Sequence, residues 1–437
     1  AAIFCRDGFI EQIGSQADLP QSADEVLDLS HHIVLPGLIN THHHFYQTLT
    51  RALPAAQDAN LFNWLTTLYP IWARMTPEDI FTSTQTALAE LALSGCTTAS
   101  DHLYLFPNGS KLDDEIAAAA EIGLRLHASR GSMSLGQSQG GLPPDSVVDT
   151  EENILKDSER LIQRYHDPKP GSKLQIVLAP CSPFSVTGEL MRESAVLARK
   201  YGVHLHTHLA ETEDEDDFCL AKFGHKPVAY MQTVDWIADD VWFAHSVWVN
   251  EAEMDLYARY GCGVAHCPSS NMRLASGIAP VMNMLARGVK LGLGVDGSAS
   301  NDGSHMLNEV RQAMLLARLN SGIKGASRSA PDAPPLMTAR QALSIATRSG
   351  AAVLGRKDIG SLEVGKCAAF FAMDLHQLDY AGAITDPLAA ILFCQPVTAN
   401  WTVVGGEVIV REGHLTTLDV RKQVEKHNQA TKRLLQI

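Results

Sequence analysis

The segment PGLINTHHH, residues 36–44, places consecutive histidines directly after a short apolar run. Two later runs end in a similar way, in HLHTH (204–208) and in LGLGVD (291–296). The carboxyl ends of the strands of a parallel α/β barrel are the places where that fold presents its catalytic groups. Three imidazoles and a carboxylate suit a borderline divalent cation such as zinc, and a catalytic site keeps one position open for water. The spacing therefore predicts a metal-dependent hydrolase, with His42, His44, His208 and Asp296 as the metal-type side chains.

Eight short runs of strand character alternate with longer segments of helical periodicity, a pattern typical of βα units around a parallel sheet. Eight is the number of strands that closes a barrel. The expected strands are 33–40, 97–102, 125–130, 174–181, 202–208, 241–246, 263–267 and 290–295. The expected helices are 76–94, which begins at an N-cap in TPED, then 113–121, 150–165, 188–201, 250–260 and 303–319.

Both ends of the chain differ from the middle, because residues 1–30 and about 358–415 carry short alternating strands and glycine turns without long helices between them. We expect them to pair as one small β-sandwich domain built from both termini. The predicted domains are therefore 1–30 plus 358–437, with a charged C-terminal helix over 418–437, and a (β/α)8 TIM-like barrel with trailing helices over 31–357. The segment 321–335, rich in Ser, Ala and Pro, is the expected connector.

Composition limits the function classes. A formal charge of −14 over 437 residues argues against a nucleic-acid partner and favours a small neutral or cationic substrate. The eight cysteines are scattered without a CxxC pair, which favours reduced thiols in a cytoplasmic protein. No run is long and apolar enough for a membrane span or a signal peptide. Homo-oligomerisation is left open, and we expect a few residues to precede Ala1, because the chain does not open on methionine.

Side chains alternate between the two faces of a strand, and this alternation indicates which histidines point toward the site. His42 and His44 point to one side and His43 to the other, so His43 is expected to be structural. His204, His206 and His208 share a face, and His208 is favoured because it is nearest the carboxyl end of its strand. His206 is expected inside the barrel or behind the ligands, and His204 in a structural role.

Carboxylates and histidines near the other strand ends are further candidates. Glu211 follows His208 by three residues, ahead of the acidic run 213–217, which we interpret as a solvated helix start. His245 ends the sixth strand, and His266, on the seventh, is a weaker candidate for the rim of the site. Gly297 after Asp296 permits a sharp turn and a close approach.

Together, PG-x4-HxH, HxxE, a sixth-strand His and a final-strand Asp resemble the amidohydrolase superfamily, within it the mononuclear branch of aminoheterocycle deaminases and triazine hydrolases. The resemblance covers essentially the whole chain and implies that His42, His44, His208 and Asp296 bind the metal. It makes Glu211 the proton shuttle and His245 the residue that orients or deprotonates the water. Binuclear relatives use a lysine at the end of the fourth strand, where this chain has APCS (179–182). One divalent ion is therefore implied, zinc with iron(II) as the alternative, which can lower the pKa of water to about 7.

Several segments resemble the version found in 8-oxoguanine deaminases: HHHFYQ with Gln47, LFNWL with Trp64, ASRGS with Arg130, and VAHCPSSNMRLASG (264–277). The resemblance implies hydrolytic deamination of a free purine-like base, 8-oxoguanine to urate and ammonia, with Gln47, Trp64 and Arg130 contacting the ring. Guanine, cytosine, an adenosine derivative or an s-triazine are the alternative substrates. A metal-binding protein without activity is the remaining class, against which Glu211 beside a full ligand set argues.

Overall fold

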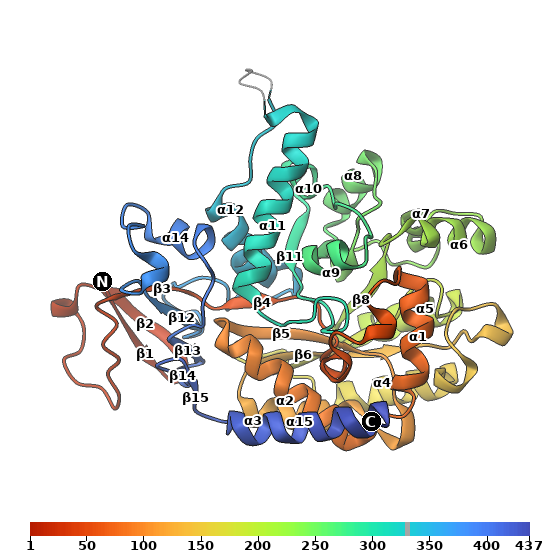
Figure 1. Cartoon of the computed structure of the whole chain (residues 1–437), viewed down its shortest axis with the longest axis horizontal. Coiled ribbons are helices and arrows are strands. Elements are labelled where there is room, and N and C mark those ends of the chain that lie inside the picture. The colour runs from red at the N-terminus through yellow and green to blue at the C-terminus, as the bar shows by residue number, and fades with distance from the viewer. Residues whose placement is uncertain (328–332) are drawn as a thin grey trace.

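Eight parallel strands close into a barrel at the centre of the molecule (Figure 1), as the sequence predicted. The structure is a computed structural model that describes residues 1–327 and 333–437. In order around the barrel the strands are β4 (Leu38–Asn40), β5 (Cys96–Leu103), β6 (Arg125–Ser132), β7 (Leu174–Pro180), β8 (His204–Leu209), β9 (Val241–His245), β10 (Gly263–His266) and β11 (Lys290–Leu293), and β11 pairs with β4 to close the ring.

Helices surround the barrel, and their ends follow capping signals in the sequence. The helix α2 begins after Thr76, whose side chain and that of Asp79 form a capping box. The expected helices are found as α2 (Pro77–Leu93), α3 (Leu112–Ile122), α4 (Glu151–Tyr165), α5 (Gly188–Tyr201), α8 (Glu251–Tyr260) and α11 (Met306–Ser321). Those not predicted are mostly short: α1 (Leu61–Trp72), α6 (Glu213–Phe223), α7 (Pro227–Thr233), α9 (Pro268–Arg273), α10 (Val281–Ala286), α12 (Ala339–Ser344), α13 (Gly350–Val353) and α14 (Pro387–Phe393).

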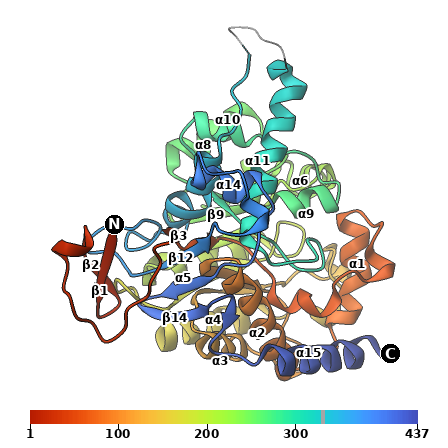
Figure 2. The same ribbon diagram turned by 60° about the vertical axis from the view of Figure 1, so that its left-hand side comes forward.

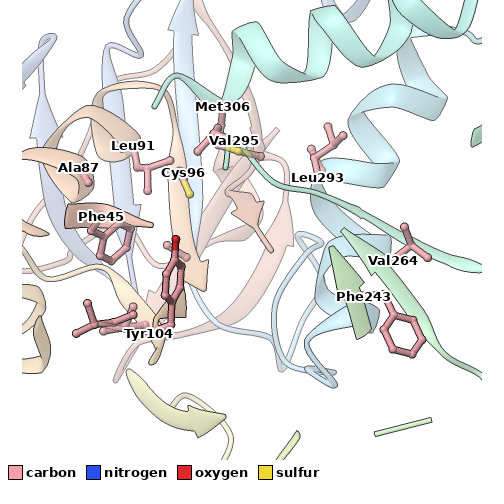
Figure 3. Close-up of a cluster of buried hydrophobic side chains, with 14 of the residues drawn as sticks. Phe45, Ala87, Leu91, Cys96, Tyr104, Phe243, Val264, Leu293, Val295 and Met306 are labelled. Atoms are coloured by element: carbon pink, nitrogen blue, oxygen red, sulfur yellow. The ribbon is translucent and has the colours of Figure 1, made fainter. Parts of the chain in front are cut away.

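The main hydrophobic core fills the layer between the barrel and these helices. Figure 3 shows part of it, where Leu91 of α2, Cys96 of β5 and Met306 of α11 come together. Phe45, directly after the histidine cluster, is 1% exposed and belongs to the same core. Burial of side chains on this scale is the main stabilising term of the fold, and it fixes the strand ends that carry the site.

Two antiparallel sheets from the chain ends lie beside the barrel (Figure 1). One pairs β1 (Ala2–Arg6) with β2 (Phe9–Gly14). The other has the order β15-β14-β13-β12-β3, with β3 (His32–Pro36), β12 (Phe370–Asp374), β13 (Trp401–Val404), β14 (Glu407–Arg411) and β15 (His414–Leu415). The expected small sheet domain from both termini is therefore present.

The expected first strand, 33–40, is in fact two strands that belong to different sheets. β3 pairs antiparallel with β12, and β4 joins the barrel after Gly37. A Cβ at Gly37 would lie 2.1 Å from Thr97 Oγ1, so the chain can cross from one sheet to the other only where no side chain is present. Residues 33–39 are almost all apolar, so the sequence pattern does not show where one strand ends and the next begins. The domain boundary at residue 30 stays a prediction; β3, which lies beyond it in the chain, pairs with the terminal sheet and not with the barrel.

The C-terminal helix α15 (Val420–Leu435) runs along α2 and supports the segment that follows the histidines (Figure 2). His427 Nε2 lies 3.0 Å from Thr48 Oγ1, in the short 3₁₀ helix Phe45–Thr50. The expected connector 321–335 is partly helical, because α11 continues as a wider turn over Gly322–Ala326; residues 328–332 of it lie outside the described residues. Within the described ranges, none of the helices combines the length and apolarity that a bilayer-spanning segment requires.

Candidate metal centre and active site

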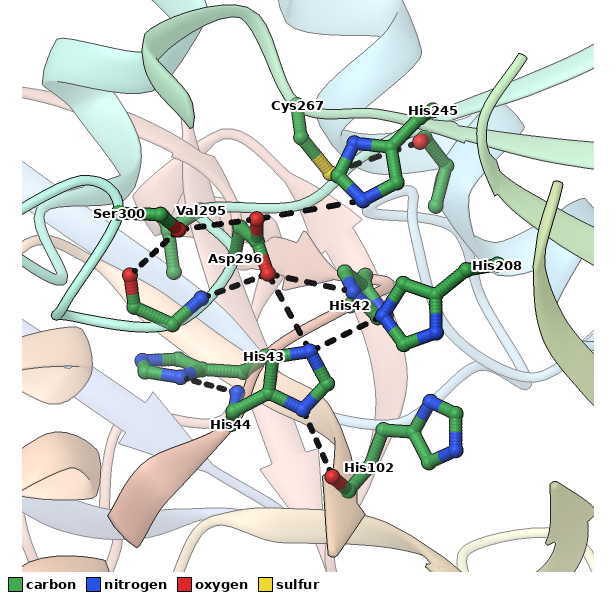
Figure 4. A network of polar contacts seen from close by, with 12 residues as sticks. His42, His43, His44, His102, His208, His245, Cys267, Val295, Asp296 and Ser300 are labelled. Carbon is green, nitrogen blue, oxygen red and sulfur yellow. Dashed lines mark hydrogen bonds and ion pairs between the residues drawn. The ribbon is translucent and has the colours of Figure 1, made fainter. Parts of the chain in front are cut away.

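The site lies at the carboxyl ends of the barrel strands, where four strand ends supply its side chains (Figure 4). His42 and His44 follow β4, His208 lies near the end of β8, His245 ends β9, and Asp296 follows β11. His245 and Asp296 have φ of 72° and 60°. Left-handed backbone at residues other than glycine is costly and persists where the surroundings hold it in place, as often happens at functional sites.

Nitrogen and oxygen atoms of four residues converge in this region. Nε2 of His44 lies 3.1 Å from Nε2 of His208. One oxygen of Asp296, Oδ1, lies 3.3 Å from His42 Nε2 and 3.4 Å from His44 Nε2. The structure therefore brings together all four side chains that the sequence singled out.

Backbone carbonyls decide which nitrogen of each ring carries the proton. The Nδ1–H of His44 donates to the carbonyl of His102 at 2.7 Å, and that of His208 donates to the carbonyl of Cys181 at 2.7 Å. In both rings the lone pair is left on Nε2, the nitrogen that faces the cluster. Hydrogen bonds of this kind are the usual means by which a protein orients metal-binding histidines.

In His42, too, the proton lies on Nδ1, and here a second histidine holds it. The Nδ1–H of His206 donates to the carbonyl of Trp242 at 2.9 Å, so its Nε2 accepts from Nδ1 of His42 at 2.8 Å. Nε2 of His42 is then a buried lone pair, and it has no hydrogen-bond partner among the described residues. His206 thus orients His42 from behind, which agrees with the position inside the barrel or behind the ligands that the sequence predicted for it.

These atoms fit a divalent cation. Burial, together with the neighbouring His44, lowers the pKa of His208 to about 3, and burial holds the pKa of His42 well below its usual range, so both rings stay neutral. Lone pairs and a carboxylate oxygen that meet in pairs at 3.1–3.4 Å repel unless a positive charge lies among them. Neutral imidazoles with one carboxylate are a common donor set for zinc.

Glu211 and His245 lie beside this cluster. Nε2 of His245 is 3.5 Å from Oε2 of Glu211 and 4.0 Å from Oδ2 of Asp296. Burial raises the pKa of Glu211. Burial alone would lower the pKa of His245, but the carboxylates of Glu211 and Asp296 outweigh it and raise the pKa. Two proton-carrying groups therefore lie in contact next to the ligand-type residues.

Glu215 corrects the interpretation of 213–217 as a solvated helix start. Its side chain is fully buried and accepts the backbone N–H groups of Ala210 and Glu211, each at 3.0 Å. Burial raises the pKa of Glu215 to about 8. Acidic residues are common in the first turn of a helix, so nothing in the sequence distinguished this one. Glu215 holds the turn between His208 and Glu211.

A cavity opens onto these groups. Gln47 and Trp64, both predicted to contact a substrate, line it together with an apolar and aromatic wall formed by Leu61, Leu65, Tyr69, Tyr104, Phe184 and Leu274. Trp64 Nε1 donates to the carbonyl of Ala299 at 3.1 Å. Oε1 of Gln47 is buried and has no partner among the described residues. A cavity with mostly apolar walls and few polar groups is typical of a small-molecule site.

Gly297 permits the close approach that was expected, although it does not make the turn. A Cβ there would lie 1.8 Å from Oε1 of Gln47, whereas the left-handed residue of the turn is Asp296 itself. The glycine therefore lets the Gln47 amide lie against the loop that carries Asp296.

Arg130 is not among the residues that line the cavity, and its predicted contact with the substrate ring stays a prediction. A Cβ at Gly131 would lie 2.7 Å from Cδ2 of His102, and because side chains alternate along a strand, that of the neighbouring Arg130 points to the other face of β6. There the guanidinium Nε donates to Asp157 of α4 at 3.0 Å, and the group stacks on the ring of Phe106. The sequence placed Arg130 at the correct strand end but could not give the direction of its side chain.

The other histidines have structural surroundings. His43 points away from the cluster, with Nε2 2.9 Å from Ser304 Oγ. His266 is buried and does not line the cavity, so the expectation that it lies at the rim is wrong. Cys181, which the sequence analysis noted only for the lysine it replaces, does line the cavity. Burial raises the pKa of this thiol to about 12, so it stays protonated.

A barrel of this kind with histidine and aspartate donors at its strand ends defines a class of metal-dependent hydrolases, and the chain belongs to the amidohydrolase family, whose model matches residues 33–409. The chain is similar to the 8-oxoguanine deaminase of Pseudomonas aeruginosa PAO1, with 49% identity over 428 residues, 98% of this chain and 93% of that protein. It is 38% identical over 435 residues to the hydroxydechloroatrazine ethylaminohydrolase of Pseudomonas sp. strain ADP, covering 95% of this chain and 88% of that one. The structure of atrazine chlorohydrolase from Arthrobacter aurescens TC1 complexed with zinc is similar at a TM-score of 0.92 and 31% identity, covering 98% of this chain and 94% of that one.

The buried carboxylate of Glu215 generates a prediction about stability. Glu215→Ala should leave two buried N–H groups without an acceptor, at roughly 1–3 kcal/mol for each. We expect a clearly lower melting temperature in thermal unfolding followed by circular dichroism. Glu213→Ala, in the same first turn but exposed, is the matched control and should melt like the unmodified protein. Equal melting temperatures for both variants would contradict the supporting role of Glu215.

Proposed function

We propose that this protein is an aminohydrolase that acts on cyclic amidines, and that it converts free 8-oxoguanine and water to urate and ammonia. The observation that carries the proposal is the carboxyl group of Glu211, in contact with His245 on the wall of a cavity that also exposes the histidine and aspartate donors. The 49% identity to an 8-oxoguanine deaminase along almost the whole chain favours this base over other heterocycles.

His42, His44, His208 and Asp296 would hold one divalent ion, zinc in this proposal, with iron(II) as the alternative. Such an ion, when bound, supplies Lewis acidity that lowers the pKa of water to about 7 and so provides a nucleophile at neutral pH. A single ion is favoured because β7 is followed by Cys181 at the position where a bridging lysine would be required.

Glu211 is the proton donor to the ring in this proposal. Attack of water at C2 of 8-oxoguanine places negative charge on the adjacent ring nitrogen, N3, which a carboxylic acid can protonate. Burial raises the pKa of Glu211, which favours the protonated form that this step requires. The carboxyl group is then regenerated by the second proton of the water, which leaves the C2 hydroxyl as that group becomes the carbonyl. The first proton, lost as the water attacks, takes a different route.

His245 and Asp296 handle the proton of the water. Nε2 of His245 lies 3.5 Å from Glu211 and 4.0 Å from Asp296, so a proton can pass among the three groups over short distances. They accept it as the C2–O bond forms and return it to the amino group as the C2–N bond breaks. The leaving group is then ammonia rather than an amide ion, and the ring carbon becomes the carbonyl of urate.

Gln47 and Trp64 would bind the heterocycle. The unpaired Oε1 of Gln47 is suited to accept an N–H from the edge of a lactam ring, and the indole of Trp64 to pack against a planar base. Burial of an unpaired acceptor is unfavourable in the free protein, so a substrate N–H that satisfies it contributes to specificity.

A triazine hydrolase is the second candidate, since the chain is also similar to a hydroxydechloroatrazine ethylaminohydrolase and to a zinc-containing atrazine chlorohydrolase. The same ligands and Glu211 would then expel an alkylamine or chloride from an s-triazine. Guanine, cytosine and adenosine derivatives would require the same chemistry.

The donor set predicts the metal content. Elemental analysis of the purified protein should give close to one equivalent of zinc or a similar ion per chain. His208→Ala should lower both this occupancy and the activity, because it removes one of the converging lone pairs. Two stoichiometric ions would overturn the proposal of a mononuclear centre.

Glu211→Gln should separate proton transfer from metal binding. The amide keeps the shape of the side chain but cannot deliver a proton, so kcat should fall by at least roughly 10²-fold. Metal content should stay nearly intact. If occupancy and rate were lost in parallel, Glu211 would be a ligand instead.

Substrate preference is tested with a panel of bases. An 8-oxopurine offers an N7–H and a C8 oxygen where guanine has an acceptor and a C–H, so a site that pairs with these groups should favour 8-oxoguanine over guanine by roughly 10²-fold in kcat/KM. Ammonia release should accordingly be fastest with 8-oxoguanine, and urate should form alongside it. Faster turnover of guanine, cytosine, an adenosine derivative or a chlorotriazine would refute the purine assignment while leaving the hydrolase intact.

A further inference from the structure

The segment VAHCPSSNMRLASG, residues 264–277, runs from β10 through α9 toward α10, and none of its residues has a role in the proposed chemistry. It contains the short helix α9 and a turn that follows it. Two of its polar side chains, Asn271 and Ser276, are buried and contact the two proton-carrying residues.

Asn271 fixes the state of His245. Its Oδ1 lies 3.0 Å from Nδ1 of His245, and it is fully buried at the C-terminal part of α9. An amide oxygen accepts, so Nδ1 of His245 carries the proton and donates it. The other nitrogen, Nε2, then faces Glu211 and Asp296 with a lone pair that can receive a proton.

Ser276 holds Glu211 in a similar way. The hydroxyl donates to Oε1 of Glu211 at 3.3 Å, while Oε2 faces His245 at 3.5 Å. Oε1 of Glu211 therefore accepts a hydrogen bond from Ser276, while Oε2 faces the imidazole of His245.

The backbone around Ser276 is built to keep the hydroxyl in this place. Ala275 has a left-handed φ of 54°, and the N–H of Ser276 donates to the carbonyl of Asn271 at 2.8 Å. On the other side, Trp248 Nε1 donates to the carbonyl of Ser276 at 2.7 Å. Gly277 has φ of 126°, and a Cβ there would lie 3.0 Å from Val247. Left-handed backbone at Ala275 is unfavourable and is retained only because these contacts hold it.

We propose that Asn271 and Ser276 are paired positioning residues, which hold His245 and Glu211 in the orientation that lets a proton pass between them. The inference rests on the proposed roles of Glu211 and His245. Both positioning residues belong to one short segment, and the hydrogen bond from the Ser276 N–H to the Asn271 carbonyl fixes the distance between them. The same bond therefore fixes the distance between His245 and Glu211, which the two residues hold. Residues that orient a reacting group in this manner commonly contribute 10- to 100-fold in activity.

Asn271 is tested by a pair of variants of nearly equal size. Asn271→Leu removes the acceptor, and kcat should fall by roughly 10- to 100-fold with little change in KM and with unchanged metal content. Asn271→Asp restores an acceptor for Nδ1–H. Since Nδ2 of Asn271 has no hydrogen-bond partner among the described residues, the exchange breaks no bond, and most of the activity should return.

Ser276→Ala removes the hydroxyl that contacts Glu211 and should lower kcat by roughly 10-fold, again without a change in KM or metal content. The control is Ser270→Ala, one residue before Asn271. Ser270 is equally buried, but its hydroxyl has no hydrogen-bond partner in the described part of the chain, so this variant should keep the activity of the unmodified protein.

All variants are assayed with whichever heterocycle the unmodified protein converts fastest, so that a wrong substrate assignment leaves this test intact. Normal kcat in both Asn271→Leu and Ser276→Ala would overturn the inference. So would failure of Asn271→Asp to recover activity, or a loss that follows metal content or KM. If Asn271→Leu does not fold, Ser276→Ala against Ser270→Ala decides. Full activity in Glu211→Gln would instead refute the proposed function itself.

Discussion

The site depends on hydrogen bonds from imidazole N–H groups to backbone carbonyls of the barrel strands and the residues that directly follow them. The Nδ1–H groups of His44 and His208 donate to the carbonyls of His102 and Cys181. His206 donates through Nδ1 to the carbonyl of Trp242, so its Nε2 accepts the Nδ1–H of His42. Each bond fixes a tautomer, and together they leave three Nε2 lone pairs beside the Asp296 carboxylate. All three carbonyls come from barrel strands: His102 lies in β5, Cys181 directly follows β7, and Trp242 lies in β9.

Crowding neutral and anionic donors in a buried place is unfavourable, and the surrounding structure offsets the cost. Ala210, His245 and Asp296 all have left-handed φ angles of 52°, 72° and 60°. Hydrogen bonds hold these turns: Ala210 N–H to Glu215, Ser246 N–H to Leu209, and Asp296 N–H to the carbonyl of His42. Buried backbone N–H groups that are paired in this way make the turns rigid, which suits chemistry that requires fixed distances.

Segments distant in sequence keep the cavity in place. Trp64 of α1 binds the loop that follows β11, and His427 of the last helix contacts Thr48, one residue beyond Gln47. The segment after β10 contacts His245 and Glu211 through Asn271 and Ser276. The polar side chains around the cavity are therefore held by parts of the chain that meet only in the folded state. The predicted metal ligands, by contrast, lie in barrel strands or within a few residues after them.

The sequence alone determined the βα alternation, the eight strands and the four donors, because strand periodicity and the position of a residue at a strand end are local properties. It could not show that strand 33–40 divides at Gly37, that Glu215 is buried while Glu213 is exposed, or that Arg130 points toward Asp157. Nor could it assign partners to Asn271 and Ser276, because their motif was visible but the residues they contact are distant in the sequence. Those features depend on which surfaces pack against each other across long sequence separations, and only the tertiary structure decides which side of an element is covered and which faces the site.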